Sequence, residues 1–120
     1  MAKRDRDVAE LLPLPPPMFH MLLALCQGER HGYALKREIL RRTDGKLNLG
    51  AGALYGSIAR MVERGLVEES AERPDLHLDD ERRRYYRITL LGRRAAQAEA
   101  QRMRDLVQQA EESLGLPETI

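Results

Sequence analysis

The segment 50–66, GAGALYGSIARMVERGL, carries the groups of this chain that are best suited to contact an anion. It predicts an amphipathic helix whose first turn is built from small residues, Gly50, Ala51, Gly52 and Ala53. Small residues at this position let backbone N–H groups approach a phosphate at the positive end of the helix dipole. We therefore expect this turn to lie against a nucleic-acid backbone. The alternative is that the two glycines serve only the turn before the helix.

The body of the same helix offers side chains that could read nucleic-acid bases. Apolar residues at helical spacing predict a buried stripe of Leu54, Ile58, Met61 and Val62. The other face then presents Tyr55, Ser57 and Arg60, and a bidentate contact of Arg60 with guanine is the sharpest expectation. A contact of Arg60 with phosphate or solvent alone is the alternative. Gly65 is expected to end the helix in the left-handed conformation.

A second group of cations begins the segment 82–92, RRRYYRITLLG. This segment predicts a strand that changes into a helix after Thr89, which is a suitable N-cap. The polar stretch before it, 72–81, predicts a loop. Loop and strand together would form a β-wing, and its returning arm would bring three arginines to phosphates or to the minor groove: Arg82, Arg83 and Arg84.

Two more helices are needed to hold these groups in place. A proline-rich lead predicts a first helix over about 17–27. A second helix is expected over 31–42, with Leu35 and Ile39 buried. The order helix, helix, helix, strand, loop, strand predicts a winged helix-turn-helix, which is mainly α with a small β-wing.

The second helix also carries candidate contact residues. Tyr33, Lys36 and Arg37 lie near its start and on its outer side, where a helix-turn-helix meets the backbone of DNA. After this helix, Leu47 and Leu49 predict the very short first strand of the winged helix.

The last helix, expected over 90–114, predicts an oligomer. Its small and apolar residues follow a 4-3-4-3-4 spacing, the a/d seam of a coiled coil: Ala96, Ala100, Met103, Val107, Ala110 and Leu114. A domain of this size leaves little for such a seam to pack on, so we expect a homodimer interface. Intramolecular packing of the seam is the alternative.

The first helix carries more apolar surface than one small core can use. Phe19 and Leu22 are therefore expected to join the dimer interface. Met18, Phe19, Met21 and Met103 are flexible or bulky apolar residues, and they would line an adaptable pocket for a small hydrophobic effector at that interface.

Composition and charge exclude several classes of protein. The net charge is only +1, but residues 30–64 contain eight basic and three acidic side chains, and 82–90 add four arginines and no acid. Such separation can give a basic face to a nearly neutral protein, although ordinary solvated helix faces are the alternative. The single cysteine excludes an internal disulfide, and no segment resembles a signal peptide or a membrane span. We expect a cytoplasmic protein that is not an enzyme and uses no metal or cofactor.

Three segments in this order resemble the PadR-like family of bacterial transcription regulators: HGYALKREI at 31–39, LGAGALYGSIARMVERGLVEE at 49–69 and LDDERRRYYRITLLGR at 78–93. The resemblance implies a dimeric winged-helix DNA-binding protein, usually a repressor, whose second helix, third helix and wing contact DNA. The family commonly has Thr or Ser where Ala53 stands and often Pro where Gly56 stands. A hydroxyl that could reach a phosphate is therefore missing here.

The sequence thus predicts a homodimeric, sequence-specific repressor that places its recognition helices in successive major grooves of a palindromic operator, about 34 Å apart. A winged-helix module that binds protein and not DNA is the alternative. The expected organisation is an N-terminal arm over 1–16, a winged-helix DNA-binding domain over 17–89, a dimerisation helix over 90–114 and a tail over 115–120.

Overall fold

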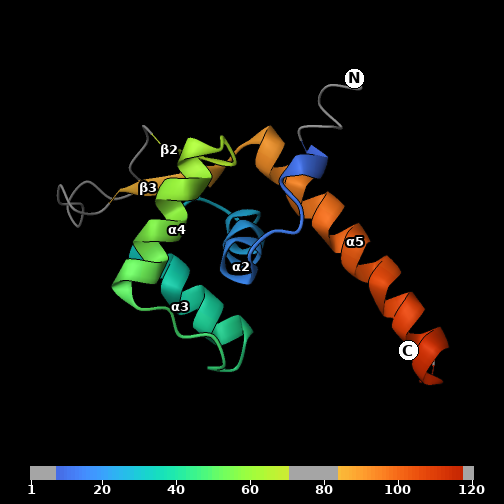
Figure 1. Cartoon of the computed structure of the whole chain (residues 1–120). Helices are drawn as coiled ribbons and strands as arrows, with labels where there is room; N and C mark the ends of the chain where they lie inside the picture. The colour runs from blue at the N-terminus through green and yellow to red at the C-terminus, as the bar shows by residue number, and fades with distance from the viewer. Residues whose placement is uncertain (1–7, 71–83, 118–120) are drawn as a thin grey trace.

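A computed structural model describes residues 8–70 and 84–117 of the chain. It is mainly helical with one small antiparallel sheet, and its elements are α2 (Pro16–Leu25), β1 (Arg30–His31), α3 (Gly32–Arg42), α4 (Ala51–Glu63), β2 (Val67–Glu69), β3 (Tyr85–Ile88) and α5 (Leu90–Leu114) (Figure 1). The predicted winged-helix fold with a long C-terminal helix is confirmed.

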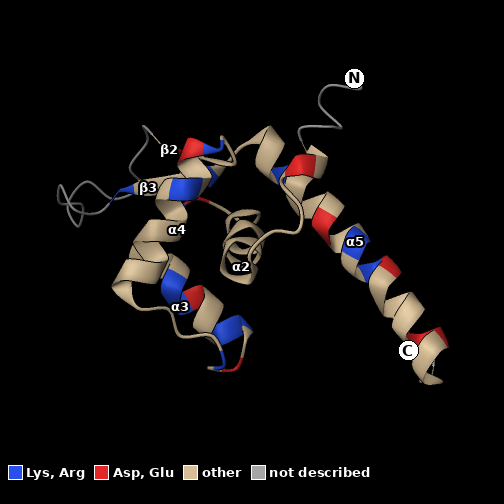
Figure 2. Ribbon diagram, viewed as in Figure 1, with Lys and Arg blue, Asp and Glu red and all other residues tan. Residues whose placement is uncertain are grey.

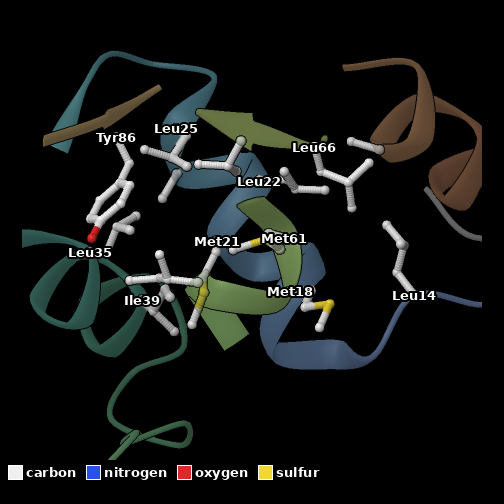
Figure 3. Packing of buried hydrophobic residues seen from close by; sticks show 14 of the residues in the cluster. Leu14, Met18, Met21, Leu22, Leu25, Leu35, Ile39, Met61, Leu66 and Tyr86 are labelled. Atoms are coloured by element: carbon white, nitrogen blue, oxygen red, sulfur yellow. The ribbon is translucent and has the colours of Figure 1, made fainter. Parts of the chain in front are cut away.

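The first helix of the winged domain, α2, lies at the centre of the molecule and contacts α3, α4, α5 and β3 (Figure 1). Its residues Met18, Met21, Leu22 and Leu25 are almost completely buried. Figure 3 shows these side chains packed among Leu35 and Ile39 of α3, Met61 of α4 and the residues Leu66 and Tyr86 near the sheet. The apolar surplus of α2 is therefore used within one chain.

Local capping signals set the ends of the helices. The imidazole Nδ1 of His31 accepts a hydrogen bond from the backbone N–H of Ala34 at 3.1 Å and so caps α3. The hydroxyl of Thr89 accepts one from the N–H of Gly92 at 3.0 Å, as expected for the N-cap of α5. Gly65 follows α4 with φ +77°, the left-handed conformation that the sequence predicts.

The first strand differs from the prediction. The sheet order is β1-β3-β2, and β1 pairs Arg30 with Tyr86 and His31 with Tyr85. The expected strand at Leu47 and Leu49 is wrong, because these side chains hold the loop before α4 against the core instead, Leu49 with only 6% of its surface exposed. A two-residue strand just before α3 carries too short a pattern to be detected by alternation.

The last helix, α5, has two halves with different environments. Near its start Gly92 packs so closely that a Cβ there would overlap the carbonyl oxygen of Leu66, and Ala95 and Ala96 are buried against the core. From residue 100 onward no residue of α5 is buried within the chain, and the helix projects from the body (Figure 1). Ala96, predicted at the dimer interface, instead packs inside its own chain.

A buried acid joins the N-terminal arm to α5. The Glu99 side chain is fully buried, and its carboxylate accepts hydrogen bonds from Arg102 at 2.8 and 2.9 Å. The backbone N–H of Leu14, itself 3% exposed, also donates to this carboxylate. The Arg102 hydrogen bond is the main reason that the pKa of Glu99 lies below its ordinary value. The described part of the predicted arm is thus docked on the helix.

Candidate nucleic-acid interface

The start of α4 is an exposed, uncapped helix N-terminus. Gly50 is the N-cap residue and no side chain accepts a hydrogen bond there. Ala51, Gly52 and Ala53 are exposed, while Leu54 is buried and anchors the first turn. The first N–H groups of a helix have no partner within the helix. The four small residues that the sequence predicts for phosphate contact therefore present backbone donors to the outside.

Arg60 lies on the outer face of α4 and extends toward this N-terminus. A Cβ on Gly56 would be 4.0 Å from the Nη2 atom of Arg60, so the guanidinium lies beside the glycine, one turn nearer the helix start. Helical side chains point in this direction by geometry. Arg60 forms no ion pair with any residue that the structure describes, so its charge is available to a ligand.

The buried side of α4 differs from the predicted stripe. Ser57 has only 7% of its surface exposed, whereas Val62 is 42% exposed. The buried residues of α4 are Leu54, Ser57, Ile58 and Met61. They keep helical spacing, but the buried face is rotated by about one residue from the predicted stripe. Ser57 was expected on the contact face, and that placement is wrong. A serine is small enough to pack where two elements approach closely, and hydropathy alone does not reveal this.

Tyrosines from α3 and α4 lie next to the start of α3, where Gly32 is buried and His31 is the N-cap. Tyr33 is 58% exposed, and the guanidinium of Arg37 lies 5.9 Å from the centre of its ring. Tyr55 of α4, 47% exposed, packs over Gly32 at the first position of α3. The structure thus brings together predicted contact residues from two helices.

Some of the cations of α3 are neutralised within the helix. The carboxylate of Glu38 accepts hydrogen bonds from Arg41 at 2.7 Å and from Arg42 at 2.9 Å. These bonds lower the pKa of Glu38 to about 2, so the carboxylate is ionised throughout the neutral range. Lys36 and Arg37 have no ion pair with a described residue and keep their charge for a partner.

At the base of the wing the arginines are also paired, which corrects the predicted local charge. Arg84 is 3.8 Å from Glu69. Arg87 is 2.8 Å from Glu68 and 3.9 Å from Glu29. Figure 2 shows basic residues in blue on α3, on α4 and beside β3. Acids distant in sequence thus reduce the positive charge expected for 82–90. Arg82 and Arg83 lie outside the described residues.

The structure forms an aromatic cluster around the start of α3 that the sequence did not predict. His31 makes an edge-to-face contact with Tyr85, with ring centres 5.5 Å apart. Tyr86 is 8% exposed, and burial is the main cause of a pKa above its ordinary value. With Tyr33 and Tyr55 nearby, the four tyrosines of the chain gather where α3, α4 and β3 meet. The sequence shows only the separate groups HGY at 31–33 and YY at 85–86, because their approach depends on β1, which was not predicted.

The residues predicted for dimerisation and effector binding separate into two groups. Leu22, Met18 and Met21 are buried in the core of one chain, and Phe19 is partly buried against the same core. The exposed seam of α5 instead borders an open groove of about 780 Å³. Its lining includes three predicted interface residues, Ala100, Met103 and Val107. Leu114 is 70% exposed on the same helix.

Residues 8–70 and 84–117 contain neither a membrane-spanning helix nor a cluster of metal ligands. No helix there is both long and apolar enough to cross a membrane. Nor do three or more His, Cys, Asp or Glu side chains gather there in a group that could hold a metal ion.

The family model described as the transcriptional regulator PadR-like family matches residues 21–98. A protein of Lysinibacillus sphaericus, named only Uncharacterized protein X, is 32% identical over 73 residues, which cover 61% of this chain and 64% of that protein. The chain thus spans slightly less than two thirds of this relative's length.

Solved structures share the fold of this chain. A PadR-like transcriptional regulator from Bacillus cereus has a TM-score of 0.65 at 23% identity, with 84% of this chain and 92% of that chain covered. A transcriptional regulator from Clostridium thermocellum has a TM-score of 0.65 at 23% identity, with 81% and 87% covered. RosR of H. salinarum has a TM-score of 0.62 at 24% identity, with 88% and 99% covered.

At these identities the structural matches establish the shared fold. The family match is independent of them and covers more than half of the chain, from α2 through the first part of α5. The protein therefore belongs to the PadR-like family of transcriptional regulators.

Proposed function

We propose that the protein is a cytoplasmic, homodimeric DNA-binding repressor that recognises a palindromic operator. The observation that supports this most directly is the exposed start of α4, where backbone donors lie on the same helix as Arg60, which has no ion pair among the described residues. In the proposed complex α4 enters the major groove. Tyr33, Lys36 and Arg37 of α3 contact the adjacent phosphates, and the wing with Arg82, Arg83 and Arg84 follows the backbone.

The dimer part of the proposal rests on α5. The second half of this helix has exposed apolar side chains at 4-3 spacing, among them Met103, Val107 and Leu114, and its own chain leaves them uncovered. A second copy of α5 would cover them and hold two winged helices at a fixed distance. Palindromic operators match this two-fold symmetry.

A small hydrophobic effector would bind at a different place from the pocket that the sequence predicts. Met18 and Met21 belong to the core, so Met103 is the flexible residue left to meet a ligand in the α5 groove. A ligand there would compete with the partner helix or shift it, and the spacing of the two recognition helices would change. Release of the operator is the expected consequence.

Salt dependence of DNA binding tests the proposed function. We expect the slope of log affinity against log salt concentration to fall by about 0.9 for each phosphate contact removed, so Lys36→Ala and Arg37→Ala should each reduce it. Arg93→Ala, on the exposed surface of α5, is the control and should leave the slope unchanged. Operators selected from random DNA would supply the probe. Failure to select any sequence, with little response of binding to salt, would favour a protein-binding module.

Arg60→Ala separates base reading from attraction to phosphate. We expect affinity for the selected operator to fall about tenfold, within the range of a lost bidentate contact to guanine, and affinity for scrambled DNA to change less than about twofold. The measurement is a titration of both DNAs at one salt concentration. Arg64→Ala is the matched control, since Arg64 is exposed just after α4 ends. An equal loss on both DNAs would make Arg60 a phosphate contact.

A further inference from the structure

We propose that Tyr55 is a positioning residue, whose ring packs on Gly32 and sets the placement of α4 against the start of α3. This inference rests on the proposed function, because it assigns a role to two residues within the proposed DNA-binding surface. The sequence alone made Tyr55 a candidate for direct contact with bases or phosphates.

The contact between the two residues leaves no room for a side chain at Gly32. A Cβ there would lie 2.7 Å from Cε1, 2.8 Å from the hydroxyl oxygen and 2.9 Å from Cζ of Tyr55. Cβ atoms in proteins essentially never come so close to another heavy atom. The ring of Tyr55 therefore rests directly on the backbone of the first residue of α3.

The backbone conformation at position 32 does not require a glycine. Gly32 is a helical residue and is not among the glycines with positive φ, so any amino acid could adopt its conformation. Alanine is a better helix former than glycine, and at an unobstructed position in a helix it would stabilise the fold. The requirement for glycine at this position comes from the tyrosine.

Tyr55 also lies where three elements of the proposed interface meet. It belongs to α4 and packs on α3. It is also near Tyr86 of β3, whose pKa is raised mainly by burial, then by the nearby Glu69, and further by Tyr55. The start of α3 is also held by the His31 cap. Movement of the Tyr55 ring would therefore alter how α3 and α4 present their contact residues together.

A double-mutant cycle tests the role. Gly32→Ala adds one methyl group at a buried position and removes no group that could touch DNA. We expect it to lower operator affinity about tenfold in the natural chain, because the ring is displaced, and by less than about twofold in a Tyr55→Ala background, where nothing obstructs the methyl group. Tyr55→Phe keeps the ring on Gly32 and should bind within about twofold of the natural protein.

The outcomes distinguish this inference from the proposed function. Additive effects of the two substitutions, or a loss with Tyr55→Phe equal to that with Tyr55→Ala, would overturn the positioning role and leave DNA binding intact. Coupling in urea unfolding without coupling in operator affinity would overturn it as well. A natural chain that binds no DNA would overturn both proposals.

Discussion

Glutamate at both Ala100 and Val107 is expected to make the protein monomeric and to lower its operator affinity at least about 100-fold. The two residues are one heptad apart on the exposed seam of α5, so the substitutions would place like charges opposite each other in a dimer. Each half-site would then be held by a separate monomer, and the gain from linking two binding events would be lost. Sedimentation and operator titration measure the two effects.

The double substitution should leave the winged helix folded, since residues of α5 from 100 onward are not buried in the chain. An unchanged urea midpoint at low protein concentration would verify this. Gln109→Glu with Ser113→Glu changes the charge equally at exposed positions that do not line the groove, and it should remain dimeric. A variant with Ala100→Glu and Val107→Glu that still sediments as a dimer would place the interface elsewhere.

Removal of the Glu99 carboxylate is expected to have the largest effect on stability. Glu99→Ala leaves the buried N–H of Leu14 without an acceptor and opens space at a fully buried position. The unsatisfied N–H costs about 1–3 kcal/mol, and the lost methylene burial adds about 1 kcal/mol or more. We expect the free energy of unfolding at pH 7 to fall by about 3 kcal/mol, as measured by urea denaturation.

Glu99→Gln is the matched control, because the amide keeps the volume and an acceptor oxygen for Leu14. Its loss should be smaller than that of the alanine variant. The folded-state pKa of Glu99 lies below its ordinary value, so the charged pair stabilises the fold above the unfolded-state pKa, and this contribution is lost as pH falls through the folded-state pKa. The difference between the natural protein and Glu99→Gln should therefore shrink toward acid pH. A difference that grows in acid would contradict the assignment.

The sequence by itself determined the helices, the last two strands and many of their ends, but not the first strand. Thr89 and Gly65 are local signals, since a cap or a left-handed residue acts within one turn of the helix that it bounds. The spacing of Leu35 and Ile39 likewise identified the buried side of α3 without reference to other elements. The winged-helix order follows from such local signals in sequence.

Only the tertiary structure decided which groups remain available at the surface. Arg84 and Arg87 are paired with Glu68, Glu69 and Glu29. A count of charges along the sequence assigns these arginines and acids to separate regions.

The same holds for packing. Ser57 is buried and Val62 exposed because α4 is oriented by its neighbours as well as by its own hydropathy. Met18 and Met21 enter the core because α2 is surrounded by other elements. The ring of Tyr55 packs on Gly32, although the two residues are far apart in sequence. Distant segments pair, bury one another and approach closely according to how the chain folds back on itself. A local sequence pattern does not predict these contacts.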